Sequence, residues 1–178
     1  LPLYAEAQGA SLSMVGAVVA SYAIAQLLLR IPLGVWADFL GRRKPFIAAG
    51  LVFASVGALA MAVAPSPWYL FAGRTITGVA ATTWVIYSVL FAAYFPSNQT
   101  ARGIGIITSV GGLAVVIATF VGGQLAELWG TDIVFFIGAI LGVLGMLSLI
   151  PVDEPVIRRT GDFTYGAFLK VATDPVVL

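Results

Sequence analysis

The stretch GIGIITSVGGLAVVIATFVGGQLA, residues 103–126, contains no charged side chain. At about 1.5 Å per residue, a helix of this length crosses the roughly 30 Å hydrocarbon core of a bilayer. The stretch is too long for a strand of a membrane β-barrel, and it lacks the alternation of apolar and polar residues typical of such strands. It therefore predicts a transmembrane helix.

Similar uncharged runs recur along the chain, at 7–29, 45–73, 75–101 and 133–152. The 178 residues are 60% hydrophobic and 10% charged, with a mean hydropathy of +1.03, whereas soluble domains carry about 25% charged residues. We predict an all-α integral membrane protein, with transmembrane helices within residues 12–150. Their expected bounds are 12–37, 46–64, 68–93, 103–127 and 132–150.

The two ends of the chain are expected to be parts of a longer polypeptide. Residues 1–4 are expected to end an earlier helix, and 151–178 to form a cytoplasmic linker that leads to a further helix. A second six-helix half is therefore an expected partner, together with the lipid bilayer.

The composition also excludes classes of function. The chain has no Cys and no His, so it lacks thiolate and imidazole metal ligands and the commonest general base. It has no phosphate-binding loop of the Gly-x-x-x-x-Gly-Lys type, no mid-helix carboxylate and too few charges for nucleic-acid binding. We expect no cofactor, no metal and no enzymatic activity.

The basic residues indicate the orientation. Those outside the helices fall on one side of an alternating topology, and the opposite loops carry only acids (Glu6, Glu127 and Asp132). By the positive-inside rule, loops 38–45, 94–102 and 151–178 are cytoplasmic. We expect a multi-pass protein of a prokaryotic inner membrane. The basic residues on this side are Arg42, Arg43, Lys44, Arg102, Arg158, Arg159 and Lys170.

A shift of 89 residues reveals a repeat, Gly-x-x-Ala-acid-x-x-Gly, which ends two helices on opposite sides of the membrane. This pattern indicates an inverted repeat of three plus three helices, as in many secondary transporters. The alternative is a coincidence between two small-residue-rich helix ends. The shift pairs Gly34, Ala37, Asp38, Gly41 and Phe46 with Gly123, Ala126, Glu127, Gly130 and Phe135.

The first copy continues as GVWADFLGRRKP, residues 34–45. An Asp at a helix C-terminus faces the unfavourable end of the helix dipole, so Asp38 needs a cation, and Arg42 and Arg43 are the nearest. Gly34 would permit close approach of another helix, and Gly41 a tight exit from this one. The alternative is a plain positive-inside signal with a stray acid.

This string resembles the signature loop between helices two and three of the major facilitator superfamily, Gly-x-x-x-Asp-(Arg/Lys)-x-Gly-Arg-(Arg/Lys). Phe39 stands where the family usually has a base, and the acid with which that base pairs would fall near Ala93. The resemblance implies the N-terminal half of a twelve-helix transporter, with these residues as a cytoplasmic gate. The matching residues are Gly34, Asp38, Gly41, Arg42 and Arg43.

Further candidates lie within the helices. Arg74 and Gly78 resemble the family's Arg-x-x-x-Gly motif of helix four. An arginine in a membrane should face protein or water, although Arg74 could also snorkel to the interface. Tyr22, Gln26 and Arg30 form a polar line on the second helix, either as a cavity wall or as donors and acceptors between helices. These five residues are the pathway and coupling candidates.

The resemblance implies secondary active transport of a small solute by alternating access. Drug-like efflux is the preferred substrate class, although the Gly-Pro pair typical of antiporters is absent from 118–123. A sugar or organic-anion symporter is an alternative, and a proton or another ion is a candidate for coupling. A sensor or binding protein that transports nothing could carry the same motifs.

Overall fold

A computed structural model describes residues 1–155, and every regular element in that range is helical. Two elements are short, α1 (Pro2–Ala7) and the 3₁₀ helix η1 (Ser97–Gln99). The longer helices are α2 (Leu12–Leu40), α3 (Lys44–Ala62), α4 (Pro67–Ala81), α5 (Trp84–Ala92), α6 (Thr100–Trp129) and α7 (Thr131–Ser148).

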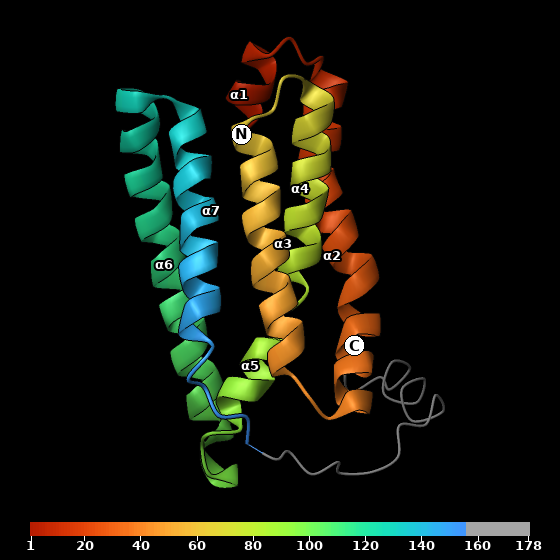
Figure 1. The fold of residues 1–178 in the computed structure, drawn as a ribbon, viewed down its shortest axis with the longest axis vertical. Helices are drawn as coiled ribbons and strands as arrows, with labels where there is room; N and C mark the ends of the chain where they lie inside the picture. Colours follow the sequence, from red (N-terminus) through yellow and green to blue (C-terminus); the bar gives the residue numbers. More distant parts are fainter. Residues whose placement is uncertain (156–178) are drawn as a thin grey trace, which may run out of the picture.

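Within residues 1–155, five helical segments are long and apolar enough to cross a membrane, with α4 and α5 together forming one of them and η1 extending α6. The long helices run side by side along the axis of the molecule (Figure 1). The predicted all-α membrane architecture is confirmed. With α4 and α5 taken as one span, every observed helix end lies within three residues of its expected bound.

Small residues hold the centre of the bundle together. Helix α3 packs against both α4 and α7, and α2 packs against α4. A Cβ atom at Gly57 would lie 2.8 Å from the carbonyl oxygen of Gly73, and one at Gly142 would overlap Ser55. Because apolar surface gives no net drive for association inside lipid, such close backbone approach is what transmembrane helices use.

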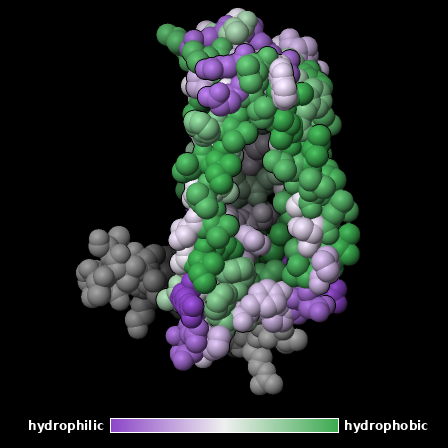
Figure 2. Space-filling model, turned by 90° about the vertical axis from the view of Figure 1, so that its left-hand side faces the viewer, coloured by the Kyte–Doolittle hydropathy of each residue, from purple (hydrophilic) through white to green (hydrophobic). Residues whose placement is uncertain are grey.

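Helices α6 and α7 stand apart from this core. Helix α6 buries only Gly103 and Ile107, and α7 only Ala139. Figure 2 faces the side of the molecule that α6 and α7 occupy, and shows a broad apolar band, polar ends and an elongated hollow between apolar side chains. An apolar surface of this extent needs lipid or further protein against it.

The helix expected at 68–93 is interrupted at Thr82 and Thr83, a break that the hydropathy pattern does not indicate. Their Oγ1 atoms donate to the carbonyl oxygens of Val79 and Ala80 at 2.6 and 2.8 Å. Their backbone N–H groups reach the same two carbonyls, each at 3.1 Å. Local bonds to carbonyls three residues back thus replace the regular helical pattern, a competition typical of threonine.

Each copy of the repeated string ends in a glycine with a positive φ. Gly41 follows α2 with a φ of +63°, and Gly130 follows α6 with a φ of +90°. Glycine adopts positive φ without a steric cost and so ends helices sharply. The two helix ends lie at opposite ends of the bundle (Figure 1), as an inverted repeat requires.

Candidate functional site

Three loops expected on the same side of the membrane meet at one end of the bundle. Hydrogen bonds connect residues 43–44 to 150–154, and Tyr94 to Asp153. We call this the basic end, defined by residues 38–45, 94–102 and 149–155. Beneath it lies a core cluster formed by Ala37, Ile47, Ile86, Leu90 and Leu149.

Asp38 pairs with Arg43 at the basic end. Nη2 of Arg43 donates to Oδ1 of Asp38 in an ion pair. The two side chains differ in environment, because that of Arg43 is 9% exposed and that of Asp38 is 64% exposed. A buried guanidinium without a carboxylate would be costly, so Asp38 neutralises Arg43 while it remains at the surface.

The glycines of the string have different roles. Gly41 has the left-handed conformation, and its N–H donates to the carbonyl oxygen of Asp38 at 3.3 Å. This turn directs the chain from α2 toward Arg43. Gly34 was expected to permit a close helix contact, but among residues 1–155 no atom lies within 4 Å of a Cβ built there. Among these residues, α2 makes its closest helix contact where Tyr22 meets Gly78 of α4, and not at Gly34.

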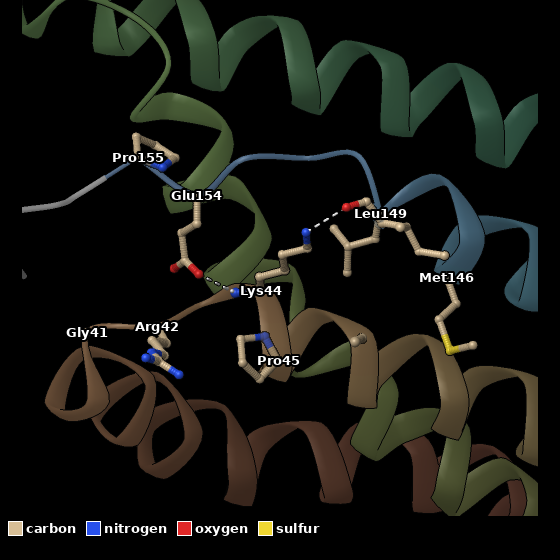
Figure 3. A pocket seen from close by; sticks show the side chains of 10 residues that line it. Gly41, Arg42, Lys44, Pro45, Met146, Leu149, Glu154 and Pro155 are labelled. Carbon is tan, nitrogen blue, oxygen red and sulfur yellow. Dashed lines mark hydrogen bonds between the residues drawn. The ribbon is translucent and has the colours of Figure 1, made fainter.

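A set of hydrogen bonds that was not expected from the sequence, called here the clasp, joins α3 to the segment after α7. The Glu154 carboxylate accepts hydrogen bonds from the backbone N–H groups of Arg43 and Lys44, the latter at 3.3 Å. Nζ of Lys44 donates to the carbonyl oxygen of Ile150 at 2.9 Å (Figure 3). It also donates to the carbonyl oxygen of Val152 at 2.7 Å. Each helix end thus receives the charge that its dipole favours.

Tyr94 adds a third connection to this clasp. Its hydroxyl donates to the carbonyl oxygen of Asp153. Burial, and then the charges of Asp153 and Glu154, raise the pKa of Tyr94 above its usual value. The hydroxyl therefore remains a hydrogen-bond donor at physiological pH. Neighbouring Ala93, where the family's acid would lie, contributes no charge.

A second cluster lies between α2 and α4. The Arg74 guanidinium carbon lies 4.2 Å from the centroid of the Tyr22 ring, a cation–π contact. Gln26 Nε2 donates to the carbonyl oxygen of Ala81 at 3.4 Å. A Cβ at Gly78 would lie 2.6 Å from the Tyr22 carbonyl oxygen, so this glycine brings the helices together. Arg30 is exposed and does not join the cluster.

Each cluster contains an arginine held by a neighbouring side chain, Asp38 for Arg43 and Tyr22 for Arg74. Among residues 1–155, no group of three or more His, Cys, Asp or Glu side chains is placed to hold a metal ion. The Nε atom of Arg74 is buried and has no hydrogen-bond partner within that range.

A family model described as Major Facilitator Superfamily matches residues 1–177. The chain belongs to the major facilitator superfamily. The resemblance carried by residues 34–45 is thereby confirmed, and a half-domain of this superfamily accounts for the all-helical bundle with its five candidate spans.

Members of the superfamily from several organisms are similar to the chain. The inner membrane transport protein YajR of Escherichia coli is 29% identical over 96% of this chain and 38% of its own length. The quinolone resistance protein NorA of Staphylococcus aureus is 31% identical over 92% of this chain and 42% of its own. The multidrug resistance protein Stp of Mycobacterium tuberculosis is 30% identical over 82% of this chain and 28% of its own length. The chain thus spans less than half of these relatives.

Proposed function

We propose that the full-length protein is a secondary active transporter that exports drug-like solutes by alternating access. The observation that carries this proposal is the superfamily match over residues 1–177. Relatives named for multidrug, tetracycline and quinolone resistance support efflux. In this proposal the basic end faces the cytoplasm, as the distribution of Lys and Arg predicts.

The Asp38–Arg43 pair would act as a gate at the basic end, with Gly34, Gly41 and Arg42 as parts of it. The six-helix half would rock against a second half, and this pair would stabilise the state closed to the cytoplasm. A pair with one partner at the surface can re-form with other charges as the halves move. The partly exposed position of Asp38 supports this role.

Asp38→Asn in the full-length protein tests the gate. The change removes the negative charge beside the buried Arg43 side chain. Hydrogen bonds to charged groups contribute about 1.5–3 kcal/mol, so we expect transport to fall roughly tenfold or more. The measurement is flux of a quinolone and of a tetracycline in proteoliposomes under an imposed pH gradient.

Asp153→Asn is the matched control, because Asp153 lies at the same end and its hydrogen bond to Tyr94 is made by its backbone carbonyl. Flux in Asp38→Asn equal to that of the unaltered protein would refute the gate. If the unaltered protein moves neither compound, the result favours the alternative of a sensor or binding protein without transport.

The alternative to a drug-like solute is an organic anion, and the position of Arg74 supports this substrate class. Its guanidinium is half-buried within a membrane-spanning helix and rests on Tyr22. Arg30 lies apart from this cluster, so Arg74 would hold an anion without a second arginine. Under this alternative, proteoliposomes with the unaltered protein should accumulate a labelled organic anion and should transport no quinolone. Arg74→Gln should abolish the uptake of the anion.

A further inference from the structure

The outer face shared by α3 and α7 carries an apolar groove of about 370 Å³. Its walls are aliphatic and aromatic, apart from Ser55 and Met146. Ser55 Oγ is occupied, because it donates to the carbonyl oxygen of Leu51 at 3.0 Å. The groove is lined mainly by Val52, Val56 and Leu59 of α3 and by Phe136, Ile140 and Val143 of α7.

The groove faces away from the bundle. Gly57 faces α4, since a Cβ there would meet Gly73 and Thr77, and Gly50 faces Thr83 just beyond α4. Val52 and Leu59 each follow one of these glycines by two positions, which is roughly 200° around a helix of 3.6 residues per turn. The groove therefore opens on the outside of the bundle, on the side of α3 opposite to its contact with α4.

The same face continues to a second pocket at the basic end, with a volume of about 580 Å³. Met146 lines both pockets, and Ala48 and Ile150 extend the two helical stripes toward the end of the bundle. Lys44 and Leu59 are about 22 Å apart along α3 at 1.5 Å per residue. The combined groove thus covers the depth of one leaflet, which is roughly 15 Å.

The pocket at the basic end carries an uncompensated cation. Its charged lining residues are Arg42, Lys44 and Glu154 (Figure 3). The Glu154 carboxylate accepts from the backbone at the start of α3, and Asp38 pairs with Arg43. Within residues 1–155, the exposed Arg42 forms no ion pair. The pocket therefore attracts an anion.

We propose that the α3–α7 face binds one anionic phospholipid of the cytoplasmic leaflet. The phosphate group lies beside Arg42 and Lys44, and an acyl chain lies in the groove past Met146 toward Leu59. Basic pockets beside transmembrane helices favour anionic headgroups, and the apolar groove matches a hydrocarbon chain. A soluble anion would use the pocket at the basic end and leave the groove empty.

The test is native mass spectrometry of the full-length protein in detergent, with phosphatidylglycerol and phosphatidylcholine of the same chains at equal concentration. We expect the phosphatidylglycerol complex to dominate. Arg42→Gln should bring the two lipids to near-equal occupancy. Arg102→Gln should not, because Arg102 lies at the same end but does not line the pocket. Equal binding by the unaltered protein, or an unchanged preference in Arg42→Gln, would overturn the proposal.

A second pair of variants tests the groove. Val56→Trp fills it and should lower the occupancy of both lipids several-fold. Phe53→Trp is the control, since Phe53 is 46% exposed and Val56 is 48% exposed, but only Val56 lines the groove. Val56→Phe is the smaller change to use if Val56→Trp fails to give a monodisperse protein. Unchanged occupancy in a folded Val56 variant would contradict the assignment.

Glycerol 3-phosphate distinguishes a lipid from a soluble anion. It carries the phosphate without the chains, so it should not raise the melting temperature at a concentration at which phosphatidylglycerol does. Equal stabilisation by both, lost in Arg42→Gln, would show that the site binds a soluble anion and would overturn the lipid assignment.

Discussion

Two glycines show that the same residue type serves different needs in this protein. Gly41 is required for its backbone, because φ is +63° where α2 ends. Gly78 has helical geometry and is required for space, because a Cβ there would meet the backbone of Tyr22. The first need can be read from the sequence as a helix-ending glycine. The second depends on which helix lies opposite, which no local pattern reveals.

Gly78→Ala is expected to destabilise the protein. Overpacking a well-packed contact costs about 1–3 kcal/mol, and here the methyl group meets backbone atoms of α2, which cannot rotate away. The gain in helix propensity, about 1 kcal/mol, does not compensate. Gly16→Ala in α2 is the control that shows the gain in helix propensity alone, because no atom lies within 4 Å of a Cβ built there. Melting temperatures in detergent should fall for the first variant and stay equal or rise for the second.

The ion-pair partner of Asp38 is also decided by single residues. Arg42 and Arg43 follow Asp38 by four and five positions, yet the structure pairs Asp38 with the more distant Arg43. The left-handed turn at Gly41 decides this, because it directs Arg43 back toward the end of α2 and Arg42 into the pocket. Such a choice depends on one dihedral angle, so sequence spacing left it open.

At the scale of elements, the hydropathy pattern predicts where the helices lie, and local hydrogen bonds interrupt one of them. The uncharged runs predicted five spans because a membrane requires about 20 apolar residues per helix. The break between α4 and α5 was missed because the signal, two adjacent threonines, usually leaves a helix intact. The clasp was missed because Glu154 bonds to residues more than 100 positions earlier. The available signal was the pair of acidic residues Asp153 and Glu154 directly after the last apolar run.

Glu154→Ala should loosen the contact between α3 and the segment after α7. Removing a side-chain cap from a helix start costs about 0.5–2 kcal/mol, so we expect a melting temperature lower by a few degrees. Asp153→Ala is the neighbouring control, since the Tyr94 hydroxyl bonds to its backbone oxygen. Equal melting temperatures for the two variants would contradict the capping role.

At the scale of the whole molecule, the repeat predicts a further helix beside α6 and α7, where Figure 2 shows the hollow. Helix α4 packs against both α2 and α3, and the shift of 89 residues relates α2 to α6 and α3 to α7. The same shift places the counterpart of the α4–α5 span before α1. We expect polypeptide that precedes Leu1 in the full-length protein to pack between α6 and α7, as α4 packs against α2 and α3.

Val110→Trp and Val116→Trp test this packing in the full-length protein. Val110 corresponds by the shift to the buried Ser21, and Val116 to the exposed Leu27. The two valines are 61% and 65% exposed among the described residues. We expect Val110→Trp to reduce the yield of folded protein and Val116→Trp to be tolerated. Equal tolerance would show that no helix covers Val110.

The clasp at the basic end also determines how mechanical force enters this half of the protein. Residues 150–154 are attached to Lys44, to the start of α3 and to Tyr94. A pull on the chain beyond Pro155 would therefore reach α3 and the end of α5 before it strained the last turn of α7. Any displacement of the following polypeptide would therefore move α3, α5 and α7 together.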